Sequence, residues 1–98
     1  MRPVRRGGSM MTERSVQIVN RNGLHARPAA EVVKTAAKFK SEITIVRDDL
    51  EVNGKSIMGV MMLAAEFGSS LTIRAHGPDA QQAVDAIAEL IAQKFGER

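Results

Sequence analysis

Four short stretches of the chain alternate apolar with polar residues, and this period of two predicts β-strands. Around Gln17, for example, Val16 and Ile18 point to one face while Gln17 points to the other. We expect the four strands to cover residues 16–18, 43–45, 50–52 and 71–75. Because each strand carries only one apolar face, the pattern is typical of an antiparallel sheet that is covered on one side.

Between these strands, apolar residues recur at the spacing of amphipathic helices. The expected helices run over residues 26–39, 56–66 and 80–95, with approximate ends. Ser56 is the expected N-cap of the second helix, and Gly68 is expected to end it as a C-cap residue. Asp79 is expected to cap the third helix, where Gln82 follows three residues later and completes a capping box.

The order of elements is therefore β-α-β-β-α-β-α. Three amphipathic helices on the apolar side of a four-stranded antiparallel sheet form a two-layer α+β domain. A length of 98 residues is enough for one small domain with a modest core, which we expect to cover residues 14–98. Residues 1–13 are rich in Arg, Gly and Met and show no periodicity, so we expect them to be a disordered N-terminal extension.

Composition excludes several classes of function. The chain has no Cys and only two His, which leaves no thiolate site and does not favour zinc; we expect neither metal nor cofactor. Residues 1–13 hold three Arg and one Glu, hence two of the three net positive charges, and the chain has no Trp or Tyr to stack on bases. We therefore expect no nucleic-acid binding by the domain itself. No apolar run approaches the ~20 residues of a membrane span, so we expect a cytoplasmic protein without membrane insertion.

His25 is the candidate for chemistry. It lies where a strand gives way to a helix, in the segment Gly23-Leu24-His25-Ala26-Arg27-Pro28-Ala29-Ala30. A lone histidine is more often a capping or packed residue, but here the small Ala26 leaves the ring accessible and Pro28 suits a first helical turn. An imidazole can take up a phosphoryl group on nitrogen, the helix N-terminus offers unpaired N–H donors to that anion, and Arg27 can add a charge-assisted contact.

A second group of candidates lies around Ser56. Its hydroxyl is suited to capping the second helix, and a regulatory phosphorylation at the same position is compatible with that role. Ile57, Met58 and Met61 share one face of this helix. They serve either the core or a surface that accepts several partners, a use to which methionine is suited. No glycine-rich phosphate loop is present, so nucleotide binding is not indicated.

Two of these segments resemble the HPr family, the histidine-containing phosphocarriers of the bacterial phosphoenolpyruvate-dependent sugar phosphotransferase system. Residues 23–29 (GLHARPA) are similar to the family's active-site block, and residues 55–61 (KSIMGVM) to its regulatory-serine block. The resemblance runs from about Arg14 to the C-terminus. The N-terminal extension has no counterpart in the family pattern.

The resemblance implies an open-faced sandwich of four antiparallel strands with three helices on one face. It implies that Nδ1 of His25 accepts a phosphoryl group from phospho-enzyme I and passes it to an EIIA domain, while Arg27 contacts the group. It implies a carrier, not a stand-alone catalyst, and we expect a monomer. Ser56 matches a serine that HPr kinase/phosphorylase modifies in some members. The expected partner-docking residues are Ala26, Ile57, Met58 and Met61.

Three alternatives stay open at this point. A nitrogen-related phosphocarrier shares the histidine block and differs mainly in its partners. A regulatory binding module of the same fold acts through phospho-Ser56, although members of that kind lack the active histidine. A small anion- or RNA-binding domain depends on the basic tail, and deletion of residues 1–13 separates it from a carrier.

Overall fold

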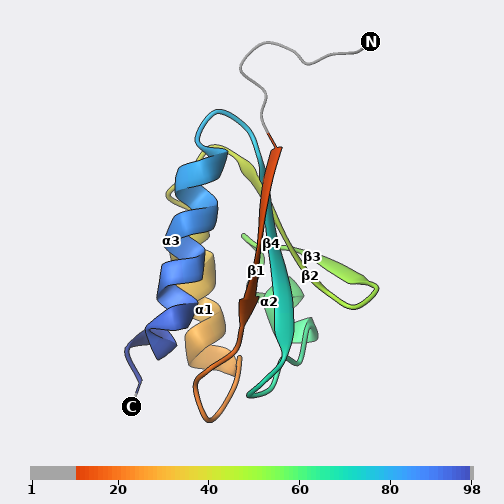
Figure 1. The fold of residues 1–98 in the computed structure, drawn as a ribbon, viewed down its shortest axis with the longest axis vertical. Coiled ribbons are helices and arrows are strands. Elements are labelled where there is room, and N and C mark those ends of the chain that lie inside the picture. Colours follow the sequence, from red (N-terminus) through yellow and green to blue (C-terminus); the bar gives the residue numbers. More distant parts are fainter. Residues whose placement is uncertain (1–10, 98) are drawn as a thin grey trace.

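A single antiparallel sheet with helices on one face forms the frame of the molecule (Figure 1). The computed structural model describes residues 11–97. The strands are β1 (Met11–Gln17), β2 (Glu42–Arg47), β3 (Leu50–Asn53) and β4 (Ser70–His76), in the spatial order β1-β4-β2-β3. The helices are α1 (Ala26–Ala36), α2 (Ile57–Met62) and α3 (Ala80–Ala92), and a short 3₁₀ helix, η1 (Lys94–Gly96), follows α3. The predicted α+β open-faced sandwich is confirmed.

The register of the sheet places the apolar residues of neighbouring strands side by side. Ile73 in the central strand β4 lies opposite Ile45 of β2, and Ala75 lies opposite Ile43. These four side chains are at most 2% exposed, because α1 and α3 cover this face of the sheet. The helix-free face carries mostly polar residues, and there Arg74 pairs with Glu13 at 2.7 Å.

The first strand begins earlier than the sequence pattern indicates. Met11, Thr12 and Glu13 pair with β4, so the predicted boundary between an extension at residues 1–13 and a domain at 14–98 lies too late. Thr12 donates a hydrogen bond to Gln81 of α3, and Arg14 donates one to Asp85 of the same helix. Because the side chains on the helix side are polar here, no alternation marks this part of the strand. The disorder predicted for residues 1–10 concerns residues outside those described.

The second helix is shorter than predicted, and Gly68 does not cap it. Helix α2 ends at Met62, and Leu63 is its C-cap. Arg47 of β2 donates hydrogen bonds to the carbonyls of Leu63 and Ala64 at 2.9 and 3.0 Å, which satisfies acceptors that the helix end leaves open. Gly68 lies instead in the turn before β4. A side chain from a distant strand thus binds the end of this helix, just where the backbone turns to the positive φ of +48° at Ala64.

The capping box predicted for α3 is wrong. Asp79 occupies the N-cap position, but its side chain makes no capping hydrogen bond. Its carboxylate accepts hydrogen bonds from the backbone N–H groups of Lys40 and Ser41, at 2.9 Å each, and from the Ser41 hydroxyl at 2.6 Å. Gly77 allows this approach, since a Cβ there would lie 2.6 Å from the Ser41 hydroxyl oxygen. Asp79 thus ties the start of α3 to the loop before β2.

These hydrogen bonds make stability depend on pH. The Ser41 hydroxyl, followed by the Lys40 N–H, lowers the pKa of Asp79 from 3.8 to about 2. Because the folded state lowers the pKa of Asp79, its ionised carboxylate stabilises the fold at every pH above 3.8, the ordinary pKa. This contribution is lost as the pH falls from 3.8 towards 2. We predict that Asp79→Asn lowers the urea midpoint at neutral pH. Between pH 3.8 and 2, the midpoint of this variant should decrease less with falling pH than that of wild type.

The measurement is urea unfolding followed by circular dichroism as a function of pH. Asp49→Asn is the matched control, because Asp49 is an exposed residue of the β2–β3 turn. An Asp79→Asn protein with the same midpoint and the same acid dependence as wild type contradicts the role given to this carboxylate.

Candidate functional site

The loop between β1 and α1 is held in place by the loop between α2 and β4. The N–H of Leu24 donates to the carbonyl of Ala65 at 2.8 Å, and the Leu24 side chain is buried. Gly23 has a φ of +72°, and a Cβ there would lie 2.6 Å from the same carbonyl oxygen. Only glycine suits both the left-handed backbone and this close approach. His25 therefore follows directly after a residue that is fixed both by its backbone hydrogen bond and by its buried side chain.

His25 is the N-cap of α1 through its backbone alone. Its φ and ψ are −84° and −171°, and its carbonyl accepts the N–H of Ala29 at 2.9 Å. The imidazole makes no capping hydrogen bond, and its side chain is 42% exposed. The imidazole therefore neither caps the helix nor packs in the core, the two ordinary roles of a histidine side chain. The ring remains accessible for chemistry.

Positive charge gathers at this end of α1. The first turn holds no acidic residue, so the unpaired N–H groups and the helix dipole are not offset from within the helix. Arg27, in the same turn, has a side chain that is 69% exposed. Pro28 is buried in the first turn, where its missing N–H removes no helical hydrogen bond. The structure therefore brings His25 and Arg27 together at a helix end suited to an anion.

Glu97 is a site residue that the sequence analysis missed. Its Oε2 lies 3.0 Å from Nε2 of His25 and 3.8 Å from a guanidinium nitrogen of Arg27. Its Oε1 accepts a hydrogen bond of 3.0 Å from the side-chain amide of Asn20. Glu97 lies 72 residues after His25, and no motif or period in the sequence connects the two. Only the return of the chain after α3 brings them together.

Ser56 is the N-cap of α2, as predicted. Its backbone is extended, and its hydroxyl accepts the N–H of Gly59 at 3.1 Å. Its neighbours on the helix divide between core and surface. Val60 is buried, whereas Ile57, Met58 and Met61 are 42%, 74% and 44% exposed. The choice between core and surface for this apolar stripe is thus decided in favour of the surface.

The exposed apolar surface is larger than the predicted docking set. Met62 and Phe67 are 65% and 66% exposed, and Ala26 at the start of α1 is exposed as well. Helix α2 packs against α1, so the surface and the His25 site are presented by neighbouring helices. The sequence pattern predicted a helix that ends at residue 66 and did not indicate that Phe67 is exposed. The observed helix ends at Met62, and Phe67 lies in the loop that follows it.

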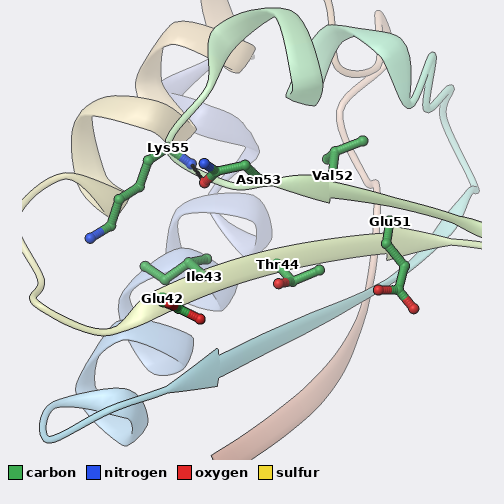
Figure 2. Close-up of a pocket in the computed structure, with 7 residues that line it drawn as sticks. All are labelled: Glu42, Ile43, Thr44, Glu51, Val52, Asn53 and Lys55. Carbon is green, nitrogen blue, oxygen red and sulfur yellow. Dashed lines mark hydrogen bonds between the residues drawn. The ribbon is translucent and has the colours of Figure 1, made fainter.

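Two hollows on the surface do not include His25 in their lining. Figure 2 shows one of about 400 Å³ between β2 and β3, lined by Glu42, Thr44, Glu51 and Asn53 among others. Lys55 lies at its rim, but its ammonium donates to the carbonyl of Phe39 at 2.7 Å. A second hollow of about 470 Å³ is lined by Val19, Arg21, Phe67 and Lys94. Neither contains a residue predicted to carry chemistry.

The described residues place further limits on the site. Residues 11–97 hold no group of three or more His, Cys, Asp and Glu side chains that could bind a metal ion. In the same part of the chain, no helix combines the length and the apolar character that crossing a membrane requires.

Comparison with known proteins identifies the family of the chain. Residues 12–93 match the family described as "PTS HPr component phosphorylation site". The phosphocarrier protein HPr of Cupriavidus necator is 48% identical over 87 residues, which cover 89% of this chain and 98% of the relative. The HPr of Treponema pallidum is 49% identical over 87 residues, covering 89% and 99%.

The fold agrees as well. A crystal structure of HPr-C-His from Thermoanaerobacter tengcongensis superposes with a TM-score of 0.85 at 46% identity, covering 89% of this chain and 98% of that one. The chain therefore belongs to the HPr family, the phosphocarrier proteins of the phosphotransferase system, which carry phosphoryl groups and are not stand-alone catalysts.

Proposed function

We propose that His25 accepts a phosphoryl group from phospho-enzyme I and passes it to an EIIA domain. The observation that carries this proposal is the exposed imidazole at the N-terminus of α1, which is not used for capping and has Arg27 in the same turn. Membership of a phosphocarrier family supports it. The cytoplasmic location and the monomeric state expected from the sequence stay predictions.

The chemistry is an exchange of one bond to phosphorus. The lone pair of Nδ1 forms a bond to the phosphorus atom while the bond from phosphorus to the donor breaks, and the donor keeps that electron pair. The group brings about −1.5 to −2 charge, which the helix end stabilises by ~0.3–1 kcal/mol at an exposed site. Arg27 adds one charge-assisted contact. These contributions orient the group without trapping it, as onward transfer requires.

The proposed docking surface consists of Ala26, Ile57, Met58 and Met61, and we extend it to Met62. Unbranched methionine side chains adapt to surfaces of different shape, which suits a carrier that must meet a donor and several acceptors in turn. Val60 and Leu63, on the other side of this segment, are buried and attach it to the core. A partner docked on α2 is therefore held close to the start of α1.

Ser56 is proposed as a regulatory position within the same surface. A phosphate on its hydroxyl meets the N-terminus of α2, so the modification is compatible with the fold. It also adds charge beside Ile57 and Met58, which a partner must desolvate. HPr kinase/phosphorylase is the proposed modifying enzyme. A nitrogen-related carrier and a module acting through phospho-Ser56 remain the alternatives, and both are tested by the partners that the protein accepts.

The first prediction concerns the acceptor. With phosphoenolpyruvate and enzyme I, the protein should gain one acid-labile phosphoryl group, and peptide mapping should place it on His25. His25→Ala should abolish labelling while circular dichroism shows an unchanged fold. His76→Ala is the matched control, since His76 lies at the end of β4 that pairs with Met11, away from the β1–α1 loop. Labelling of His25→Ala at the wild-type level disproves the assignment.

The second prediction concerns Arg27. Arg27→Ala should slow phosphoryl transfer by about tenfold to a hundredfold, because a hydrogen bond to a charged group contributes about 1.5–3 kcal/mol. Its urea midpoint should change little, because the side chain is 69% exposed. Arg27→Lys keeps the charge without the planar guanidinium, so its transfer rate should lie between those of wild type and Arg27→Ala. Rapid-quench kinetics measure the rates, and equal rates in wild type and Arg27→Ala remove Arg27 from the transfer step.

The third prediction concerns Ser56. Ser56→Asp should raise the KM for this protein as a substrate of enzyme I by roughly fivefold, for ~1 kcal/mol of unfavourable charge at the docking surface. Ser56→Asn keeps a capping side chain without the charge and should behave like wild type. If both variants show wild-type kinetics, charge at this position does not regulate docking on enzyme I.

A further inference from the structure

We propose that Glu97 is a positioning residue for phosphoryl transfer, which holds the proton of His25 on Nε2 and thereby presents Nδ1 as the nucleophile. The inference rests on the proposed function of His25. It starts from one contact, the 3.0 Å between Nε2 of His25 and Oε2 of Glu97. The carboxylate belongs to the C-terminal segment that follows η1, beside the loop that precedes α1.

The contact determines which ring nitrogen carries the proton. An ionised carboxylate only accepts hydrogen bonds, so the imidazole nitrogen that faces it must be the donor. A neutral imidazole has one N–H, and placing it on Nε2 leaves the lone pair on Nδ1. Within residues 11–97, the ring of His25 forms its hydrogen bond through Nε2, and none involves Nδ1. The nitrogen proposed to attack phosphorus is thus left unprotonated, on a side chain that is 42% exposed.

Glu97 is itself held in place, as a positioning residue must be. Its Oε1 accepts 3.0 Å from the amide of Asn20, and the same amide nitrogen donates to the carbonyl of Gly23 at 2.8 Å. Asn20 is 1% exposed, and the Glu97 side chain is 15% exposed. The buried amide therefore links the carboxylate to the loop that carries His25. A surface carboxylate in a chance pairing would lack this second anchor.

The backbone before Glu97 is unusual in a way that the site explains. Lys94 and Phe95 adopt φ values of +60° and +57°, a left-handed conformation that L-residues other than Asn and Asp rarely adopt, and Gly96 follows at +79°. The Phe95 side chain is 5% exposed and packs in the core, which compensates for the strained turn. The turn reverses the chain after α3 and delivers Glu97 to the start of α1. Such strain is typically retained at functional positions.

The proposed step balances in both directions. When Nδ1 bonds to phosphorus and the donor leaves with its electron pair, the ring becomes a positively charged phospho-imidazolium that still carries its proton on Nε2. The Glu97 carboxylate faces that charge and stabilises it, as a buried aspartate does behind the histidine of serine proteases. On transfer to the acceptor, the electron pair of the nitrogen–phosphorus bond returns to Nδ1. No proton has to move to Glu97 at any point.

The test uses the full chain with Glu97→Ala, Glu97→Gln and the matched control Glu89→Gln. Glu89 is an exposed carboxylate of α3 whose hydrogen bond is to Gln93. Long-range ¹H–¹⁵N spectra of the His25 ring at alkaline pH, where imidazoles are neutral, report the tautomer. Single-turnover transfer from phospho-enzyme I reports the rate. The two readouts are independent, because the spectra require no partner protein.

We expect wild type and Glu89→Gln to carry the proton on Nε2 and to transfer at the same rate. Glu97→Ala should admit the Nδ1–H tautomer and slow transfer by about tenfold to a hundredfold, the range for loss of a hydrogen bond to a charged group. Glu97→Gln keeps an acceptor oxygen without the charge, so it should retain the tautomer and transfer at an intermediate rate.

An unchanged tautomer in Glu97→Ala overturns the proposal, as does an unchanged or faster transfer rate. A faster rate means that Glu97 competes with the phosphoryl group for Arg27. Failure of the proposed function is separate and shows as an unlabelled His25 in wild type. Circular dichroism confirms that each variant is folded before it is scored.

Discussion

The hydrogen bond between the Leu24 N–H and the Ala65 carbonyl, 2.8 Å long, is the contact on which the functional end of the molecule depends. It joins the loop before α1 to the loop after α2, two segments that lie at the same end of the sheet (Figure 1). Gly23 makes the approach possible, since any Cβ there would meet the same carbonyl at 2.6 Å. This contact joins the loop that carries His25 to the loop that follows α2, whose exposed apolar residues form the proposed docking surface. For the proposed function, the joint matters because it keeps the docking surface and the ring of His25 near each other.

The two helix N-termini in this unit are capped in different ways, and the difference separates their chemistry. At α2 the Ser56 side chain itself accepts the N–H of Gly59. At α1 the backbone of His25 begins the helix, and the imidazole is left out of the capping hydrogen bonds. A ring engaged in capping would have no nitrogen available for an incoming group. Backbone capping by His25 therefore keeps the imidazole out of the helix cap, as the proposed phosphoryl transfer requires.

Charge at the start of α1 comes from three sources in two parts of the chain. The helix supplies its dipole and Arg27 its guanidinium, while the compensating carboxylate comes from Glu97, beyond the end of α3. The arrangement keeps the first turn of α1 itself without acidic residues. An acidic residue fixed there would repel the phosphoryl group of the proposed transfer, whereas the Glu97 carboxylate contacts Nε2 and leaves Nδ1 without a hydrogen bond. The division of charges fits a site that is to be loaded and unloaded repeatedly.

From the sequence alone it was possible to predict the order of elements, the one-sided sheet, and His25, Arg27 and Ser56 as the residues of interest. Each of these depends on short-range signals, namely periods of two and 3.6, capping residues and two local motifs. The tertiary structure decided the rest, because the deciding partners are far apart in the chain. Asp79 leaves its own helix for Ser41, 38 residues away, and Glu97 reaches His25 across 72 residues. Strand β1 extends to Met11 because it pairs with β4, and its polar side chains give no alternation that could announce it. Sequence periodicity reflects local secondary structure and the face that it buries. A hydrogen bond between residues far apart in the chain depends on the tertiary fold, so no local pattern in the sequence predicts it.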